Sequence, residues 1–174
     1  ADEQLAHLIG DEIESLWNEP KGQVLLEGKL YTVSFYIHAF LCAGITKDDV
    51  VRNKNPRNNY FRIEDYSKRH VSYVDGVGSN TGYMKRDNLY AGSTTAAHEY
   101  GHSLGLDHPK ILDIRGLGRP SIMYPRGTLV DAEFQYDPLA IAGESGGTIN
   151  PVCRRVMQQN IDELRLEEKL LVGK

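Results

Sequence analysis

The spacing of apolar side chains near the start of the chain predicts a helix. Within residues 2–18, apolar positions recur every three or four residues, at Leu5, Leu8, Ile9, Ile13, Leu16 and Trp17. This period is typical of a helix that buries one face. Pro20 and Gly22 follow, and residues of these types commonly end helices.

The pattern then changes to the two-residue period of strands. Residues 24–26 and 30–40 lie on either side of a Glu27-Gly28 turn signal, which favours a hairpin. In the second arm, the apolar positions alternate with polar ones, so that this arm should turn one face inward. The apolar positions are Tyr31, Val33, Phe35, Ile37 and Ala39.

The middle of the chain predicts a surface loop followed by short strands. Residues 46–59 are charged, rich in asparagine and interrupted by a proline, which is typical of a loop. Residues 60–66 and 70–74 are rich in aromatic and β-branched side chains and are predicted as short strands. A further strand is predicted at residues 82–89. The glycine-rich stretch between the last two is predicted as a turn.

The second half contains a helix, a long irregular region and a second helix. Residues 93–104 are predicted as helical, with Ser93 or Thr94 as the N-cap and Gly105 just beyond the end. Residues 107–148 show little periodicity. Asn150-Pro151 is a helix start, and the apolar pattern after it predicts a helix to about Leu166. The whole pattern indicates an α+β fold.

Composition and charge narrow the classes of protein. The chain has 174 residues, of which 40% are hydrophobic and 25% charged, and this is ordinary for one folded domain spanning residues 1–174. A net charge of -4 argues against a nucleic-acid-binding protein, because phosphates require a basic surplus. No apolar run approaches the roughly 20 residues that span a bilayer. We expect a monomer without a membrane span.

The cysteines and the first residues bear on where the protein acts. Cys42 and Cys153 are far apart in the sequence and could form one disulfide or remain two buried thiols. The chain begins with neither an initiator methionine nor a signal peptide. We therefore expect a mature form or a piece of a longer protein, and a secreted or extracellular location.

Residues 98–108, HEYGHSLGLDH, contain three histidines whose spacing predicts a metal site. His98 and His102 are four positions apart, so on a helix both imidazoles project from one face and can reach one zinc ion at about 2.0–2.1 Å. Gly105 allows a sharp turn that brings His108 back to the same ion. Glu99, beside the first ligand, is placed to act as a general base.

The ligand set predicts catalytic zinc. Three protein ligands leave one coordination position open, whereas structural zinc normally has four ligands and favours cysteine. Histidine pairs with this spacing also arise by chance on helix surfaces. The additional glycine and third histidine at fixed offsets make that explanation much weaker.

HEYGHSLGLDH resembles the zinc signature of the metzincin metallopeptidases, and the later segment SIMYP, residues 121–125, resembles their Met-turn. The resemblance implies a twisted, mostly parallel sheet with the active-site helix above the cleft, in an upper subdomain of about residues 1–105. It also implies an irregular lower subdomain of about residues 106–174 that ends in a helix. Met123 would form a hydrophobic floor beneath the zinc.

Within that superfamily the sequence is similar to the matrixins, the matrix metalloproteinase-like group, in GHSLGLDH and MYP. Pro109 after the third histidine is what serralysins show, and residues 111–120 form an insertion. The resemblance implies that Tyr124, Pro125 and Arg126 line the pocket for the residue after the cut. Pro125 occupies the position of the tyrosine that stabilises the oxyanion in serralysins and astacins, so Tyr124 is given no such role.

The sequence offers only a weak candidate site for a second metal ion. His70, Asp75 and the glycines that follow partly resemble the structural zinc and calcium loop of matrixins, but the later histidines are missing. We therefore predict no second zinc, and a calcium ion stays an alternative at this loop.

The sequence thus predicts a zinc-dependent endopeptidase that hydrolyses internal peptide bonds of proteins or peptides. His98, His102 and His108 would hold one zinc ion, and Glu99 would take a proton from the zinc-bound water and pass it to the leaving amine. Two alternatives are a zinc-containing module that binds peptides without cutting them, and the protease effector or toxin domain of a larger secreted bacterial protein.

Overall fold

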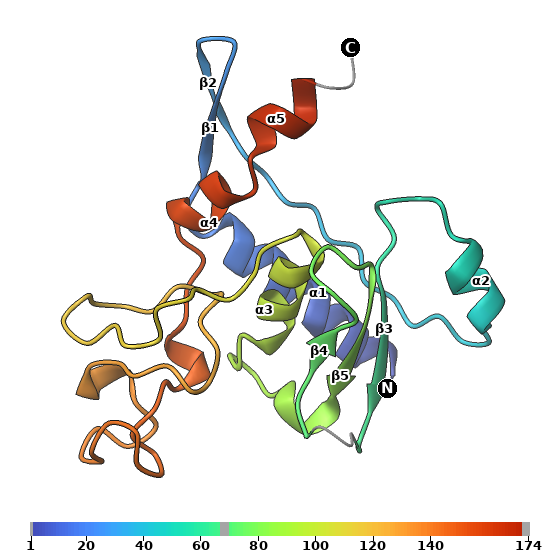
Figure 1. Cartoon of the computed structure of the whole chain (residues 1–174). Helices are drawn as coiled ribbons and strands as arrows, with labels where there is room; N and C mark the ends of the chain where they lie inside the picture. The colour runs from blue at the N-terminus through green and yellow to red at the C-terminus, as the bar shows by residue number, and fades with distance from the viewer. Residues whose placement is uncertain (1, 67–69, 172–174) are drawn as a thin grey trace.

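The computed structural model describes residues 2–66 and 70–171 and shows an α+β protein with two small sheets. Figure 1 shows α1 and α3 crossing at the centre of the molecule, with the three-stranded sheet on one side. The long irregular region lies on the other side. The hairpin and the C-terminal helices lie together at one end.

Helix α1, Glu3–Asn18, confirms the first predicted helix. Asp2 is its N-cap, because its side chain accepts a hydrogen bond from the backbone N–H of Leu5 at 2.8 Å. Ile13 and Trp17 lie on the buried face that the apolar spacing predicts.

The hairpin forms, but its second strand is shorter than predicted. Strands β1, Gln23–Leu26, and β2, Lys29–Thr32, pair antiparallel. Residues 33–40 are outside any ladder, although their exposure alternates as predicted. Side chains of α1 bind their backbone instead: Asn18 exchanges two hydrogen bonds with Phe35, and Glu14 accepts one from the N–H of Ile37. The alternating pattern predicted the buried face but not the hydrogen-bonding partner.

The second sheet has the order β3-β5-β4. Strand β3, Tyr60–Glu64, is parallel to β5, Thr81–Lys85, and β4, Tyr73–Val74, is antiparallel to β5. The expectation of a mostly parallel sheet is therefore wrong, because this sheet is mixed and the hairpin is antiparallel. The predicted strand at residues 82–89 ends early, at a 3-10 turn over Arg86–Asn88.

The predicted loop at residues 46–59 contains a short helix, α2, Lys47–Arg52. Thr46 and Asp49 form a capping box, in which each side chain binds the backbone N–H of the other residue. This signal is present in the sequence, but the surrounding charge and asparagine content obscured it.

The single C-terminal helix predicted from Asn150 is also wrong. Only a 3-10 turn forms at Pro151–Cys153, and it is followed by α4, Gln158–Glu163, and α5, Leu166–Leu171. Arg154 is extended, with φ -67° and ψ 148°, which ends the first turn. Arg165 has φ +50° and separates α4 from α5.

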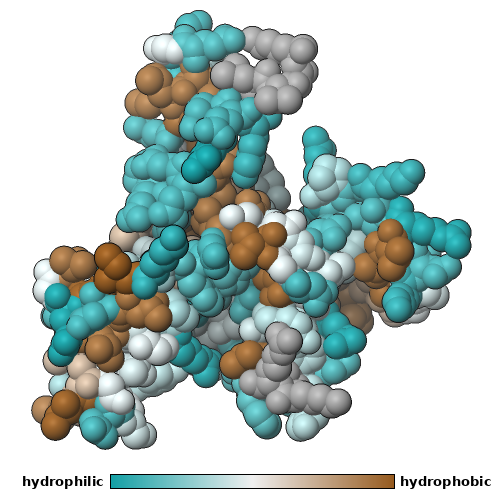
Figure 2. Space-filling model, viewed as in Figure 1, coloured by the Kyte–Doolittle hydropathy of each residue, from teal (hydrophilic) through white to brown (hydrophobic). Residues whose placement is uncertain are grey.

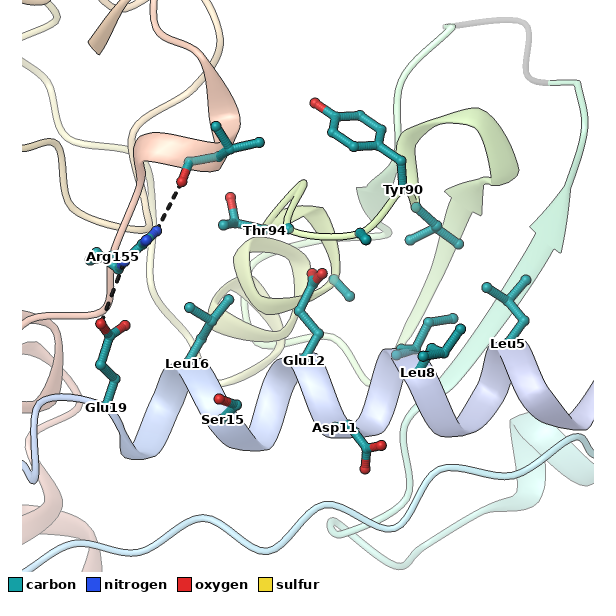
Figure 3. Close-up of a pocket in the computed structure, with 16 residues that line it drawn as sticks. Leu5, Leu8, Asp11, Glu12, Ser15, Leu16, Glu19, Tyr90, Thr94 and Arg155 are labelled. Atoms are coloured by element: carbon teal, nitrogen blue, oxygen red, sulfur yellow. Dashed lines mark hydrogen bonds and ion pairs between the residues drawn. The ribbon is translucent and has the colours of Figure 1, made fainter. Parts of the chain in front are cut away.

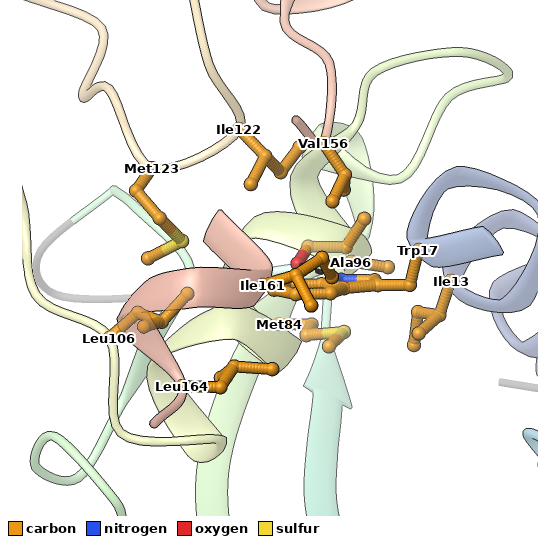
Figure 4. Packing of buried hydrophobic residues seen from close by; sticks show 11 residues of the cluster. Ile13, Trp17, Met84, Ala96, Leu106, Ile122, Met123, Val156, Ile161 and Leu164 are labelled. Carbon is orange, nitrogen blue, oxygen red and sulfur yellow. Dashed lines mark hydrogen bonds between the residues drawn. The ribbon is translucent and has the colours of Figure 1, made fainter. Parts of the chain in front are cut away.

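The main hydrophobic core joins α1, β5, α3 and α4 around the fully buried Trp17 (Figure 4). Met123 and Ile122, from the irregular region, complete it. A second cluster lies within the irregular region and consists of Ile114, Val130, Phe134 and Ile149. The division into upper and lower subdomains stays a prediction.

The surface shows apolar side chains gathered over part of the irregular region, at the lower left of Figure 2. Exposed apolar residues of this region include Leu117, Leu139 and Ile141. Among the described residues, no helix combines the length and the apolar character that a bilayer span requires.

Candidate metal centre

Helix α3, Thr95–Ser103, carries the first two histidines and is anchored by α1. The indole N–H of Trp17 donates a buried hydrogen bond of 3.1 Å to the carbonyl oxygen of Ala97. The Trp17 ring also meets Tyr100 edge-on, with 5.8 Å between centroids. Trp17 thus holds α3 at Ala97, the residue before His98, and at Tyr100, on the helix face opposite His98.

Glu12 of α1 lies near the first turn of α3. Thr94 precedes the helix in the left-handed region, with φ +58°, and its side chain caps no backbone group. Burial raises the pKa of Glu12, and the backbone of Ala96 and Gly92 and the charge of Arg154 oppose that rise. Figure 3 shows Glu12 reaching toward Thr94 across a cavity of about 750 Å³ between α1 and the start of α3. Thr94 is the N-cap residue, as predicted, and the hydroxyl of Ser93 accepts a 3.3 Å hydrogen bond from the N–H of Thr95.

Gly105 turns the chain at the C-terminus of α3, as predicted. Its φ is +101°, in the region that favours glycine. The N–H of Gly105 donates to the carbonyl of His102, and the N–H of Leu106 donates to the carbonyl of Gly101, each at 3.0 Å. This pair of bonds is a Schellman motif. It ends the helix and directs residue 108 back toward the first two histidines.

His98, His102 and His108 converge on one point. Their ligand atoms all lie within 4.8 Å of one another. Nε2 of His108 is 3.1 Å from Nε2 of His98 and 3.1 Å from Nε2 of His102. Nitrogens bound tetrahedrally at about 2.0–2.1 Å from one zinc ion would be roughly 3.3 Å apart. The spacing therefore fits a metal ion held by the three Nε2 atoms.

The hydrogen bonds behind the rings orient two of the three ligands. Nδ1 of His98 lies 2.7 Å from the carbonyl oxygen of Ile122, and Nδ1 of His102 lies 2.8 Å from that of Leu106. A carbonyl only accepts, so Nδ1 carries the proton and Nε2 presents its lone pair. Burial is the largest cause that lowers the pKa of His98, well below its ordinary value, and of His108. Both shifts favour the neutral ring, the form that binds a metal ion.

Glu99 lies beside this cluster and is not one of its ligands. Its side chain is 5% exposed, and its Oε2 atom is buried without a hydrogen-bond partner among the described residues. Burial raises the pKa of Glu99 to about 7, while the charge of Arg154 opposes that rise. A buried carboxylate with a free oxygen and a pKa near neutrality is suited to proton transfer.

Met123 packs against α3 at Gly101. It is fully buried, and a Cβ atom added at Gly101 would lie only 2.4 Å from its sulfur. Glycine is therefore required at this position for the methionine to approach the helix backbone. The preceding residue, Ile122, accepts the hydrogen bond from His98. The turn at Met123 thus contacts the helix that carries two of the histidines, and its role as a floor beneath a metal ion stays a prediction.

A cleft of about 440 Å³ opens in front of the histidines. Pro125 and Arg126 line it, together with the three histidines, Glu99 and residues of β4. Tyr124 is not among the lining residues. It packs instead against the second hydrophobic cluster, and its carbonyl accepts a hydrogen bond from Arg154.

His70 and Asp75, the residues considered for a second ion, are not brought together as ligands. The carboxylate of Asp75 accepts a 2.6 Å hydrogen bond from the hydroxyl of Thr81, and His70 lies edge-on to Tyr66. In residues 2–66 and 70–171, the histidine triad is the only group of three or more potential ligand side chains. The calcium alternative thus gains no support. Cys42 and Cys153 are free thiols.

Arg154 is the cleft residue that the sequence analysis missed. It is 4% exposed and lines the same cleft as Glu99 and the histidines. Its position, inside a segment predicted as helix, concealed it. The paired arginines after Asn150-Pro151 in an otherwise apolar helix face were the available signal.

Comparison with known proteins identifies no relative of this chain. No protein-family model, curated protein or solved structure shows a significant match to the chain.

Proposed function

We propose that this protein is a zinc-dependent endopeptidase. The observation that supports the proposal most strongly is the convergence of three imidazoles beside a buried carboxylate outside the cluster, at the edge of an open cleft. Three histidines with an open position favour zinc in a catalytic role over structural zinc. The resemblance of residues 98–108 and 121–125 to metzincin motifs agrees with this chemistry and suggests a metzincin-like fold.

The protein's own residues have distinct roles in the proposed reaction. His98, His102 and His108 would hold the metal, and Met123 and Ile122 support their positions. A bound zinc ion supplies Lewis acidity, which polarises the scissile carbonyl and makes water more acidic. Glu99 accepts the proton of the attacking water on a carboxylate oxygen and then donates it to the leaving amine.

The cleft suggests how a substrate would bind. Strand β4 lies at an edge of the three-stranded sheet, and Tyr73 and Val74 line the cleft. A sheet edge can pair with an extended peptide through backbone hydrogen bonds. We propose that β4 offers this edge, because β5 is central and paired on both sides. Secretion remains a proposal: such an enzyme would act outside the cell.

The function is tested by cleavage of an unbiased peptide library, with the cut sites read by mass spectrometry. We expect zinc-dependent cuts inside peptide chains, because an edge strand holds residues on both sides of the scissile bond. Release of single terminal residues would contradict an endopeptidase. Binding without any cleavage would instead support the peptide-binding module.

The pH dependence should show one acid limb. Glu99 acts in its ionised form, and burial raises its pKa to about 7, so activity should be lost as the pH falls through that range. A bound dication would favour the carboxylate and move the limb to lower pH. The measurement is kcat/KM against pH, with zinc content determined at each point. A profile that stayed flat down to the ordinary glutamate value, about 4.3, would contradict the role of Glu99.

A further inference from the structure

A buried guanidinium lies at the cleft without a matching ion pair. Arg154 donates to the Thr94 hydroxyl at 3.0 Å, to the Tyr124 carbonyl at 3.1 Å and to the Ser93 carbonyl at 3.4 Å. All three acceptors are neutral. Across the described residues, no carboxylate forms an ion pair with this side chain. Burial of a charge is costly unless the charge is paired, so this arrangement is informative.

The Arg154 side chain is both charged and incompletely used. Burial lowers its pKa to about 10, with the charge of Glu99 opposing that change, so it remains protonated at neutral pH. A guanidinium has five N–H groups, and the three hydrogen bonds above use three of them. The remaining donors belong to a side chain that lines the cleft.

A second arginine adds positive charge at the same place. Arg126 is exposed, lines the cleft and donates a 3.3 Å hydrogen bond to Asn88, a neutral acceptor. Its charge acts against that of Arg154 and contributes to the lowered pKa of that residue. Like charges in one cleft are unfavourable until an anion neutralises them.

The carboxylates of the cleft are already in use. Glu99 is the proposed base, and Asp107 accepts a 2.7 Å hydrogen bond from the N–H of His108. These two carboxylates match the two arginines of the cleft in number, so a dication held by the histidines would leave the cleft with a net positive charge. A substrate carboxylate would neutralise part of that charge.

We propose that this cleft binds a substrate carboxylate next to the scissile bond, with Arg154 and Arg126 as its partners. The substrate class is then peptides with Asp or Glu beside the cut, or with a free C-terminal carboxylate close to it. Guanidinium donors bind carboxylates through charge-assisted, often bidentate, hydrogen bonds. The inference rests on the proposed function, since it assigns specificity to that same site.

The test compares matched peptides that differ at one position. The first set consists of peptides with blocked ends, based on a library substrate, that carry Glu, Gln or Lys at one of the positions beside the cut. The second set has a free C-terminal carboxylate near the cut in place of the charged side chain. We expect kcat/KM for the Glu peptide to exceed that for the Gln peptide by about 10- to 100-fold, the range of a charge-assisted hydrogen bond. Preference confined to the second set would identify the C-terminal carboxylate as the ligand and contradict an endopeptidase.

Charge reversal identifies the partners. Arg126→Glu is at an exposed position and should keep the fold, abolish the Glu preference and improve cleavage of the Lys peptide. The matched control is Arg57→Glu, which reverses an exposed arginine of the loop after α2. Arg154→Lys keeps a charge without the planar fork and should weaken the preference. Thermal unfolding of each variant separates loss of specificity from loss of fold.

Binding distinguishes the two proposals. The zinc-loaded Glu99→Gln protein should bind the Glu peptide more tightly than the Gln peptide by calorimetry, and Arg126→Glu in that background should remove the difference. If the wild type cleaves nothing but this difference persists, the endopeptidase proposal fails while the carboxylate site stands. Equal treatment of Glu and Gln peptides, or equal effects of Arg126→Glu and Arg57→Glu, would overturn the inference alone.

Discussion

Replacement of Glu99 by glutamine should reduce kcat for peptide hydrolysis by about 10²–10⁴-fold while one zinc ion stays bound. The amide has the shape of the carboxylate but cannot take a proton from water. The fold should tolerate the change, because the Oε2 atom of Glu99 has no hydrogen-bond partner among the described residues that could be lost. The measurement is steady-state kinetics together with metal analysis of the same sample.

A matched control is Glu133→Gln, which neutralises an exposed glutamate in the irregular region. It should retain wild-type kcat. Loss of zinc from the Glu99→Gln protein would mean that Glu99 is a ligand. Retention of most of the activity would show that another group transfers the proton.

Replacement of His108 by alanine should weaken zinc binding by at least about 100-fold and abolish hydrolysis. Even residues behind the ligands contribute 10- to 100-fold to metal affinity in such sites, so loss of a ligand should cost at least the upper value. His108 suits this test because it is exposed and follows the helix, so its removal opens no core cavity. Zinc affinity is measured by competition with a chelator of known affinity.

The control for this variant is His7→Ala, on the exposed face of α1. Its zinc affinity should equal that of the wild type. His98→Ala provides a second comparison, since it also leaves the Ile122 carbonyl without its 2.7 Å donor and should lower stability as well. If His108→Ala bound zinc as tightly as the wild type, the ligand set would be wrong.

The histidine cluster could be predicted from sequence because its geometry is local. His98 and His102 occupy one face of a short helix, and Gly105 has the positive φ that brings His108 back. Each of these relations spans at most ten residues, so helix periodicity and glycine chemistry were sufficient. Met123 was predicted only through the resemblance, because its contact with Gly101 is a tertiary one.

The contacts that connect distant segments could not be predicted. Glu12 lies near the start of a helix more than eighty residues away, and nothing in the local pattern marks that contact. Residues 33–40 have the alternation of a strand, yet Asn18 and Glu14 satisfy their backbone groups in place of a neighbouring strand. The apolar pattern predicted that Arg154 lies in a helix. Its backbone is instead extended, and its side chain bonds to Thr94 and Tyr124 at the cleft. In each case a polar side chain from elsewhere in the chain determined the outcome.

We expect peptide hydrolysis by this protein to depend on one zinc ion held by the three histidines. The most direct test is to strip the protein with a chelator, remove the chelator and measure peptide hydrolysis as zinc is added back. Activity should rise in proportion to zinc and reach its plateau at one ion per chain, because the described residues provide one such ligand cluster. A plateau at two ions, or no hydrolysis at any zinc concentration, would contradict the account.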